Sequence, residues 1–224
     1  MLAHYSIESE ILGRFPESKN HVFFYSDSFC DKLWVIIKQN LVYKLDHMIF
    51  CCDPYANFDL KEVFEMFDEL DKRFDGYFKE ISGPIFEGPE NIYQLYEKWL
   101  MTRYPNVKLD VYTGYFYYMT TEQQHKLLAH EIQLPEGYTF ANFEMKDLES
   151  ITFSRPFSGA DNLEQDRAML SQMPYSLIKK DDQVVAVEMV DPSGYLRSHF
   201  VLPKHRGKGL GNAVEWDISK KCIM

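Results

Sequence analysis

The segment from His199 to the C-terminal Met224 restricts the fold more than any other part of the chain. An apolar run ends at Pro203, a basic and glycine-rich turn follows, and the last residues have the composition of a helix. Since strand-like and helix-like segments also mix elsewhere, we expect an α+β fold, or α/β with a mixed sheet.

The turn itself has the properties of an anion-binding site. Its residues are Arg206, Gly207, Lys208, Gly209, Leu210 and Gly211. Glycines let the backbone approach a ligand closely, and the first amides of a helix lack partners within it. These amides and the helix dipole attract anions, so we expect a diphosphate here. The alternative is a glycine-rich connection with solvated basic side chains. The glycine spacing is neither that of a Walker A loop nor that of the dinucleotide fingerprint.

Charge narrows the class of ligand. The chain has 224 residues and a formal net charge of −10. A general nucleic-acid binder carries a broad basic surface, whereas here the basic residues are dense only from Lys204 to Lys208. We therefore expect a small anionic ligand and no nucleic acid.

Cysteine spacing and hydropathy bear on whether the chain holds a metal, forms disulfides or crosses a membrane. The four cysteines, Cys30, Cys51, Cys52 and Cys222, have the spacing of neither a zinc site nor a disulfide framework. We expect free thiols and no metal. No apolar run approaches the ~18 residues of a membrane span, so no membrane association is expected. The N-terminus lacks the pattern of a secretory signal.

The first part of the chain predicts a sheet with helices. Strands are expected at 21–25, 33–37 and 47–52 from their β-branched and aromatic residues. Asp59 with Glu62 forms a capping-box pattern that opens a helix ending near Gly76. The further expected elements are a loop at 83–90, a helix at 91–104, one or two strands within 109–119 and a short helix at 121–132. Residues 134–137 break the pattern, which predicts two domains, 1–135 and 136–224.

The second domain alternates strands and helices. The expected elements are a strand at 138–145, a short helix at 146–151, a helix at 162–173 and strands at 175–180, 184–190 and 195–202. Asp166 is the odd polar residue on the apolar side of its helix. "DDQ" and "DPSG" are the turns between the last three strands.

The spacing Arg206-x-x-Gly209-x-Gly211 after an apolar strand resembles the acyl-CoA signature of the GNAT N-acyltransferases. Residues 193–210 are similar to the matching segment of the glycine N-acyltransferase family. The resemblance extends over about 138–221 and is weak over 1–137, where the family has a divergent N-terminal α/β domain.

The resemblance implies a GNAT-like fold and acyl transfer from CoA to the amino group of glycine or another small amine. It implies that the backbone of Val201 and Leu202 faces the pantetheine arm and that the amides from Arg206 to Gly211 hold the diphosphate. It also implies a mitochondrial location. The N-terminus lacks an ordinary import pattern, which leaves the cytoplasm as the alternative.

The catalytic base departs from the family pattern. The family has Gly-Glu-x-Arg where this chain has Gly194, Tyr195, Leu196 and Arg197. A phenol with an ordinary pKa of about 10 is a poor base, although Tyr195 could donate a proton to a leaving thiolate or simply pack.

Two other residues near Tyr195 have side chains that could act as a base. His199 lies roughly 13 Å along the strand from Tyr195 and cannot simply replace the carboxylate. Glu188 is a candidate base. If Val190 pairs with Tyr195, however, Glu188 stands opposite Arg197, and a cross-strand ion pair is expected instead.

A second departure concerns the C-terminus. In the family, further strands and a helix follow the helix after the anion turn, so the resemblance implies a C-terminally truncated GNAT domain. We then expect the strand at 195–202 to be an exposed edge that can pair with another chain. The alternative function is therefore an inactive form or pseudoenzyme that acts as a binding or interaction protein.

Overall fold

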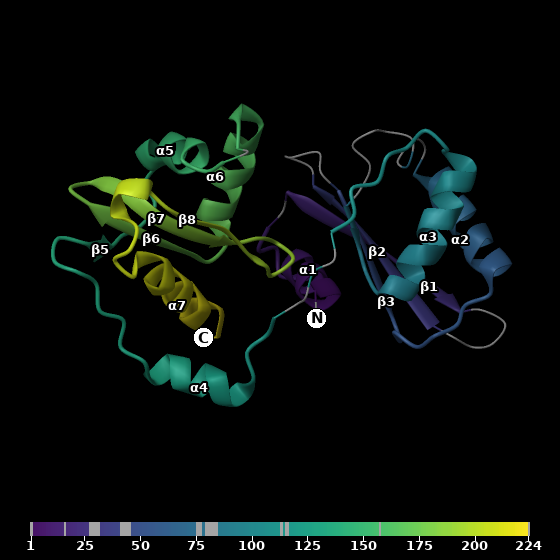
Figure 1. Ribbon diagram of the computed structural model, residues 1–224, viewed down its shortest axis with the longest axis horizontal. Coiled ribbons are helices and arrows are strands. Elements are labelled where there is room, and N and C mark those ends of the chain that lie inside the picture. Colours follow the sequence, from purple (N-terminus) through teal and green to yellow (C-terminus); the bar gives the residue numbers. More distant parts are fainter. Residues whose placement is uncertain are drawn as a thin grey trace. The chain divides into compact units, whose positions relative to one another are not determined.

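The computed structural model describes residues 2–15, 17–26, 32–40, 46–74, 78, 85–112, 114, 117–156 and 158–223 (Figure 1). The chain is of the α+β class and forms two compact units. Unit 1 comprises Met1–Ile7 and Ser18–Thr113, and unit 2 comprises Glu8–Glu17 and Gly114–Met224. The units thus divide after Thr113, whereas the sequence placed a boundary at 135.

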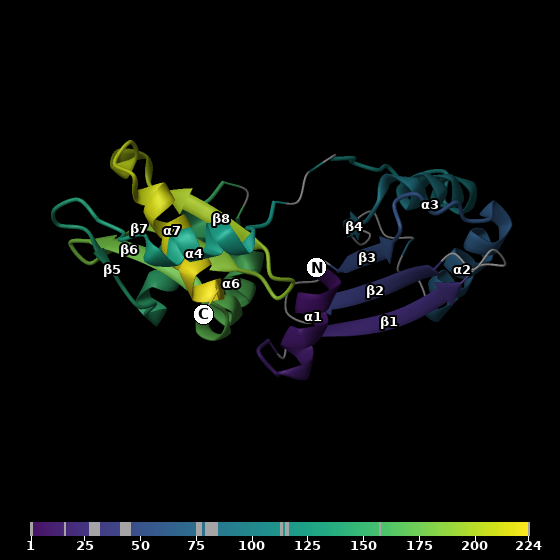
Figure 2. The ribbon, with the colours of Figure 1, turned by 90° about the horizontal axis from the view of Figure 1, so that it is seen from below.

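Unit 1 is built on a mixed sheet. Its strand order is β1 (Ser18–Ser26), β2 (Lys32–Asn40), β3 (His47–Cys52) and β4 (Ile85–Glu87). The first three strands are antiparallel, and β4 runs parallel to β3 (Figure 2). The three strands expected from sequence are confirmed. The loop expected at 83–90 is corrected, because Ile85–Glu87 pairs with β3.

Two helices cover one face of this sheet, α2 (Leu60–Arg73) and α3 (Glu90–Arg103) (Figure 1). The Asp59 carboxylate accepts from the amides of Lys61 and Glu62, which fixes the start of α2. The fully buried Trp99 lies in the core between the helices and the sheet. Both helices are confirmed, and the Gly76 end expected for α2 lies outside the described residues.

Two other expectations for this part of the chain were wrong or incomplete. The described residues between 109 and 119 form no strand. Helix α1 (Leu2–Ile11) was not expected at all, since its apolar residues do not form one clear face. In the segment that begins at residue 109, Leu109 nevertheless packs against the core of unit 1, so tertiary contacts hold it without a sheet partner.

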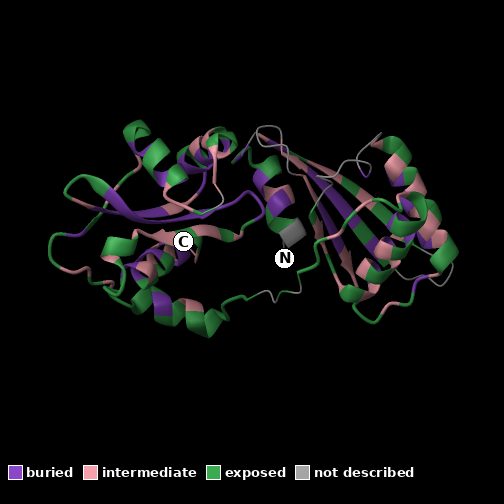
Figure 3. Ribbon diagram, turned by 45° about the horizontal axis from the view of Figure 1, so that its top comes forward, coloured by how far each residue is buried: buried purple, intermediate pink, exposed green. Residues whose placement is uncertain are grey.

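Unit 2 is a sheet between two layers of helices (Figure 1). The strand order is β5 (Thr139–Phe140), β6 (Tyr175–Lys180), β7 (Gln183–Val190) and β8 (Leu196–Val201), all antiparallel. Helices α5 (Leu148–Phe153) and α6 (Leu163–Gln172) lie on one face and α7 (Leu210–Ile223) on the other. Helix α4 (Thr121–Ala129) packs against α7. Figure 3 shows β6 and β7 buried along almost their whole length.

Three short 3₁₀ turns complete this unit, at Met145–Asp147, Ala160–Asn162 and Pro203–His205. The helices and the last three strands are confirmed. The strand expected at 138–145 is only the two residues of β5. It stops because the Phe143 amide donates to the Tyr175 hydroxyl at 3.0 Å and the chain then turns into the 3₁₀ segment.

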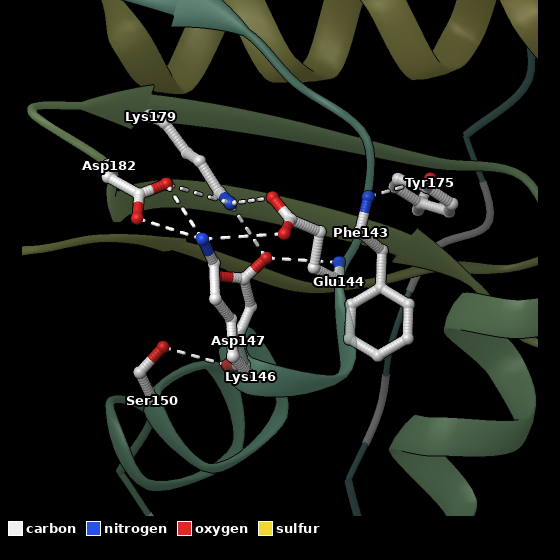
Figure 4. A network of polar contacts seen from close by, with 8 residues as sticks. All are labelled: Phe143, Glu144, Lys146, Asp147, Ser150, Tyr175, Lys179 and Asp182. Carbon is white, nitrogen blue, oxygen red and sulfur yellow. Dashed lines mark hydrogen bonds and ion pairs between the residues drawn. The ribbon is translucent and has the colours of Figure 1, made fainter.

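A charged network joins this corner to the hairpin of β6 and β7 (Figure 4). The Lys179 ammonium lies 2.9 Å from Asp147 and 3.0 Å from Glu144. Lys146 binds Asp182 at 2.8 Å. Burial lowers the pKa of Lys179, but the two carboxylates outweigh it and raise that pKa. The network therefore holds Lys179 charged and fixes β5 against the hairpin.

Candidate functional site

The turn that the sequence singled out connects β8 to α7. Leu202 ends the pairing with β7, since its amide donates to the Val185 carbonyl at 2.9 Å. Gly207 and Gly209 then have φ angles of 72° and 77°, which only glycine adopts without strain. The first bond of α7 runs from the Ala213 amide to the Gly209 carbonyl at 3.0 Å. The strand, turn and helix expected here are confirmed.

The backbone amides of this turn are open. Within the described part of the chain, no protein acceptor takes the N–H groups of residues 207–212. A Cβ at Gly207 or Gly209 would meet no atom within 4 Å. Free amides at the start of a 14-residue helix can hold an anion, because the helix dipole adds to their partial charges.

Basic side chains stand around the same turn. Lys208 donates to the Tyr138 hydroxyl at 3.0 Å, and that hydroxyl also lies 3.0 Å from Nδ1 of His205. The Lys180 ammonium lies 5.0 Å from the centroid of the Tyr138 ring. Because Tyr138 is buried, it fixes the ammonium groups of Lys208 and Lys180 beside the open amides.

Arg206 anchors the turn to the strand before it. Its Nε donates to the Val201 carbonyl at 2.9 Å. Since the Leu202 amide points to β7, the backbone of Val201 is the one that faces the free edge. Leu210 is buried and fastens the start of α7 to the sheet, so it serves the site through its backbone.

A β-bulge separates the outer part of β8 from this turn. Val187 pairs with Phe200 and Met189 pairs with Arg197, so Ser198 and His199 together oppose a single residue of β7, Glu188. Ser198 has a φ of 60°, an uncommon value for a residue other than glycine. His199 alternates regularly with Phe200 and Val201, so its side chain lies with that of Val201 on the face that carries α7.

The register of β8 against β7 overturns the expected Glu188–Arg197 ion pair. Val190 pairs with Leu196 and not with Tyr195, which moves Arg197 away from Glu188. The Arg197 guanidinium lies 4.0 Å from Asp191, whereas Glu188 Oε2 lies 3.2 Å from Nδ1 of His199. A bulge cannot be seen in a strand pattern when its positive-φ residue is a serine.

Glu188 is an acidic side chain in a buried position. It is 4% exposed, and its strand neighbour on β6, Ser176, is fully buried. Burial raises the pKa of Glu188; His199 lowers it, and Glu215 raises it further. The His199 imidazole is thus the group that favours the charged form of the Glu188 carboxylate.

Tyr195 lies in the turn before β8. Its amide donates to Asp191 Oδ1 at 3.2 Å and its carbonyl accepts from the Asp191 amide at 2.9 Å. The half-buried residue therefore closes the hairpin through its backbone. Sequence reasoning weighed Glu188 and His199 separately and missed that the fold brings them together.

Comparison with protein-family models and with curated proteins finds no match. A Drosophila protein whose X-ray structure comes from a structural genomics consortium is similar in fold, with a TM-score of 0.57 and 11% sequence identity. The similarity covers 98% of this chain and 73% of that one. At this identity it supports the α+β fold and carries nothing about function.

Two further properties concern cofactors and membranes. Among the residues that the structure describes, no three His, Cys, Asp or Glu side chains are grouped so as to hold a metal ion. None of the described helices has the length and apolar composition needed to cross a bilayer.

Proposed function

We propose that the chain binds acyl-CoA at the turn 206–211 and transfers the acyl group to the amino group of glycine or another small amine. It would then resemble the glycine N-acyltransferases of the GNAT superfamily in fold and activity. The observation that carries the proposal is the row of open amides at the start of α7, directly after the edge strand β8.

The strength of hydrogen bonds to a charged group favours a diphosphate at this position. A hydrogen bond to a charged group contributes about 1.5–3 kcal/mol. Several such bonds from the amides of 207–212, with Arg206 and Lys208 nearby, can offset the desolvation of a diphosphate. The Val201 carbonyl accepts from Arg206, so the group at the free edge of β8 that remains for a pantetheine arm is the Val201 N–H.

Calorimetry with CoA tests this proposal. We expect Gly209→Glu and Arg206→Glu each to weaken CoA binding at least tenfold, because each places negative charge against the diphosphate. Gly13→Glu and Arg14→Glu are matched controls. Gly13 also has a positive φ, 63°, with no atom within 4 Å of its Cβ position, and the Arg14 side chain is 56% exposed. The controls should leave CoA affinity unchanged.

A folded wild-type chain with no measurable CoA affinity would overturn the proposal. Equal losses in the Gly209 and Gly13 variants would also count against it, since both glycines carry the same backbone strain. Circular dichroism of each variant establishes that the chain remains folded.

One observation favours a second candidate function, that of a non-catalytic interaction protein. β8 is the last strand in the order of its sheet, and it presents Leu196 and His199 as exposed side chains. An unpaired edge of this kind can add a strand from another chain. The oligomeric state of the chain in solution tests this second function.

A further inference from the structure

Glu188 and His199 bring a buried carboxylate and an imidazole to ion-pair distance, although Glu188 Oε2 makes no hydrogen bond among the described residues. Glu188 Oε2 lies 3.2 Å from Nδ1 of His199, and the carboxylate is buried while the imidazole is 42% exposed. A carboxylate at Nδ1 favours the tautomer with the proton on that nitrogen. The lone pair of a neutral ring is then on Nε2.

Gly211 lies next to that second nitrogen and has no side chain to cover it. A Cβ at position 211 would lie 3.0 Å from Nε2 of His199 and 3.7 Å from Cγ2 of Val201. A side chain on this residue of α7 would therefore cover the nitrogen. Because Gly211 also belongs to the open turn, the imidazole lies beside the proposed anion site.

We propose that His199 is the general base of the amine substrate and that Glu188 is its positioning residue. This inference rests on the proposed function. A general base within reach of the proton that it removes contributes roughly 10²–10⁴-fold to a rate. The buried carboxylate also stabilises the imidazolium that forms, since opposite charges attract strongly away from water.

Protons and bonds balance in the resulting reaction. Nε2 of His199 takes one proton from the substrate ammonium, and the free amine attacks the thioester carbonyl. The C–N bond forms and the C–S bond breaks. The second proton of the attacking nitrogen goes to the leaving sulfur, which gives free CoA thiol. His199 then returns its proton to solvent.

Other groups around the pair affect its charge. On α7, the carboxylate of Glu215 and the thiol of Cys222 are near enough to interact with Glu188. On β6, the Ser176 hydroxyl is opposite Glu188. These groups face the Glu188 carboxylate from the helix and from the neighbouring strand.

Two measurements on the full chain test the proposal. The first is nitrogen NMR of His199, which should show the neutral ring protonated on Nδ1, and Glu188→Gln should remove that preference. The second is thiol release from acetyl-CoA with glycine and a panel of small amines. His199→Gln should lower kcat at least 100-fold, and Glu188→Gln should lower it less. His125→Gln, at an exposed position on α4, is the control.

The pH dependence separates a base from a structural residue. The deficit of His199→Gln should shrink as the pH rises toward the pKa of the amine, because the amine then loses its proton to solvent. A structural role predicts a deficit that does not change with pH. CoA binding by calorimetry should be the same in His199→Gln and wild type.

Each negative outcome has a different meaning. Unchanged turnover in His199→Gln would overturn the dyad and leave the proposed function standing. A wild-type chain that binds CoA but releases no thiol with any amine would overturn the dyad as a base and leave the CoA site. Absence of CoA binding in the folded chain would overturn the proposed function and, with it, the role of His199.

Discussion

Arg155 and Asp166 form an ion pair on the opposite face of the sheet from α7. Their side chains are 9% and 3% exposed, and the Thr152 hydroxyl donates to Asp166 at 2.7 Å. Arg155 also donates to the hydroxyl of Ser198, the positive-φ residue of the bulge. Burial lowers the pKa of Arg155 and raises that of Asp166, so desolvation outweighs their attraction. The pair therefore specifies a geometry more than it adds stability.

Removing one member of this pair should be costly. We expect Asp166→Asn to lower the free energy of unfolding by about 3–5 kcal/mol, because it leaves the Arg155 guanidinium buried without its counter-charge. Urea unfolding measures the change. Glu122→Gln is the control, since its ion pair with Lys126 is exposed and should be worth less than about 1 kcal/mol. Similar losses in the two variants would contradict this account.

At the scale of elements, the contact between β8 and the first turn of α7 decides whether the site is assembled. His199 comes from the strand and Gly211 from the helix, and no side chain separates them. Alanine has a higher helix propensity than glycine, by about 1 kcal/mol in a helix interior and by less in the first turn, where Gly211 lies, so propensity alone favours Ala at position 211. Only the neighbouring imidazole opposes it.

Gly211→Ala should therefore separate function from stability. We expect the half-exposed imidazole to move away from the new methyl group, which breaks its contact with Glu188 and lowers turnover while unfolding changes little. In a His199→Ala background the same change should stabilise the chain. A double-mutant cycle by urea unfolding gives the coupling, expected within the usual 0.5–3 kcal/mol for contacting residues. Zero coupling would show that the two residues do not touch.

At the scale of the whole molecule, unit 2 ends its sheet on β8 with side chains that are only partly buried. Val201 uses its carbonyl within the turn, but the edge as a whole has no further strand among the described residues. Unprotected edges pair with other strands, so two copies of the chain can join their sheets here.

Self-association through this edge can be measured by sedimentation. We expect wild type to form a dimer as its concentration rises, and Leu196→Lys to weaken that dimer, because a charge on an edge strand opposes strand addition. Leu128→Lys on α4 is the control, since both leucines are 39% exposed. A wild-type chain that stays monomeric at high concentration would remove the support for the interaction function.

Local sequence patterns predict most of the helices and strands. Periodicity and capping gave α2 and α3, β-branched runs gave the main strands, and glycine spacing located the turn before α7. These patterns missed α1, which has no clear apolar face, and they lengthened β5, because the tyrosine that ends that strand comes from β6. Sequence patterns predict a helix, strand or turn correctly where its residues interact mainly with neighbours along the chain.

Tertiary structure alone decided the pairing of Glu188. Val190 pairs with Leu196, one residue later than expected, and the bulge at Ser198 shifts the register by one more residue, so the glutamate meets His199 and not Arg197. The bulge is held from the other face by Arg155, which is distant in sequence. The backbone conformation of Ser198 thus depends on contacts that only the folded sheet supplies. The sequence could therefore name Glu188 and His199 as candidates without showing that they lie together.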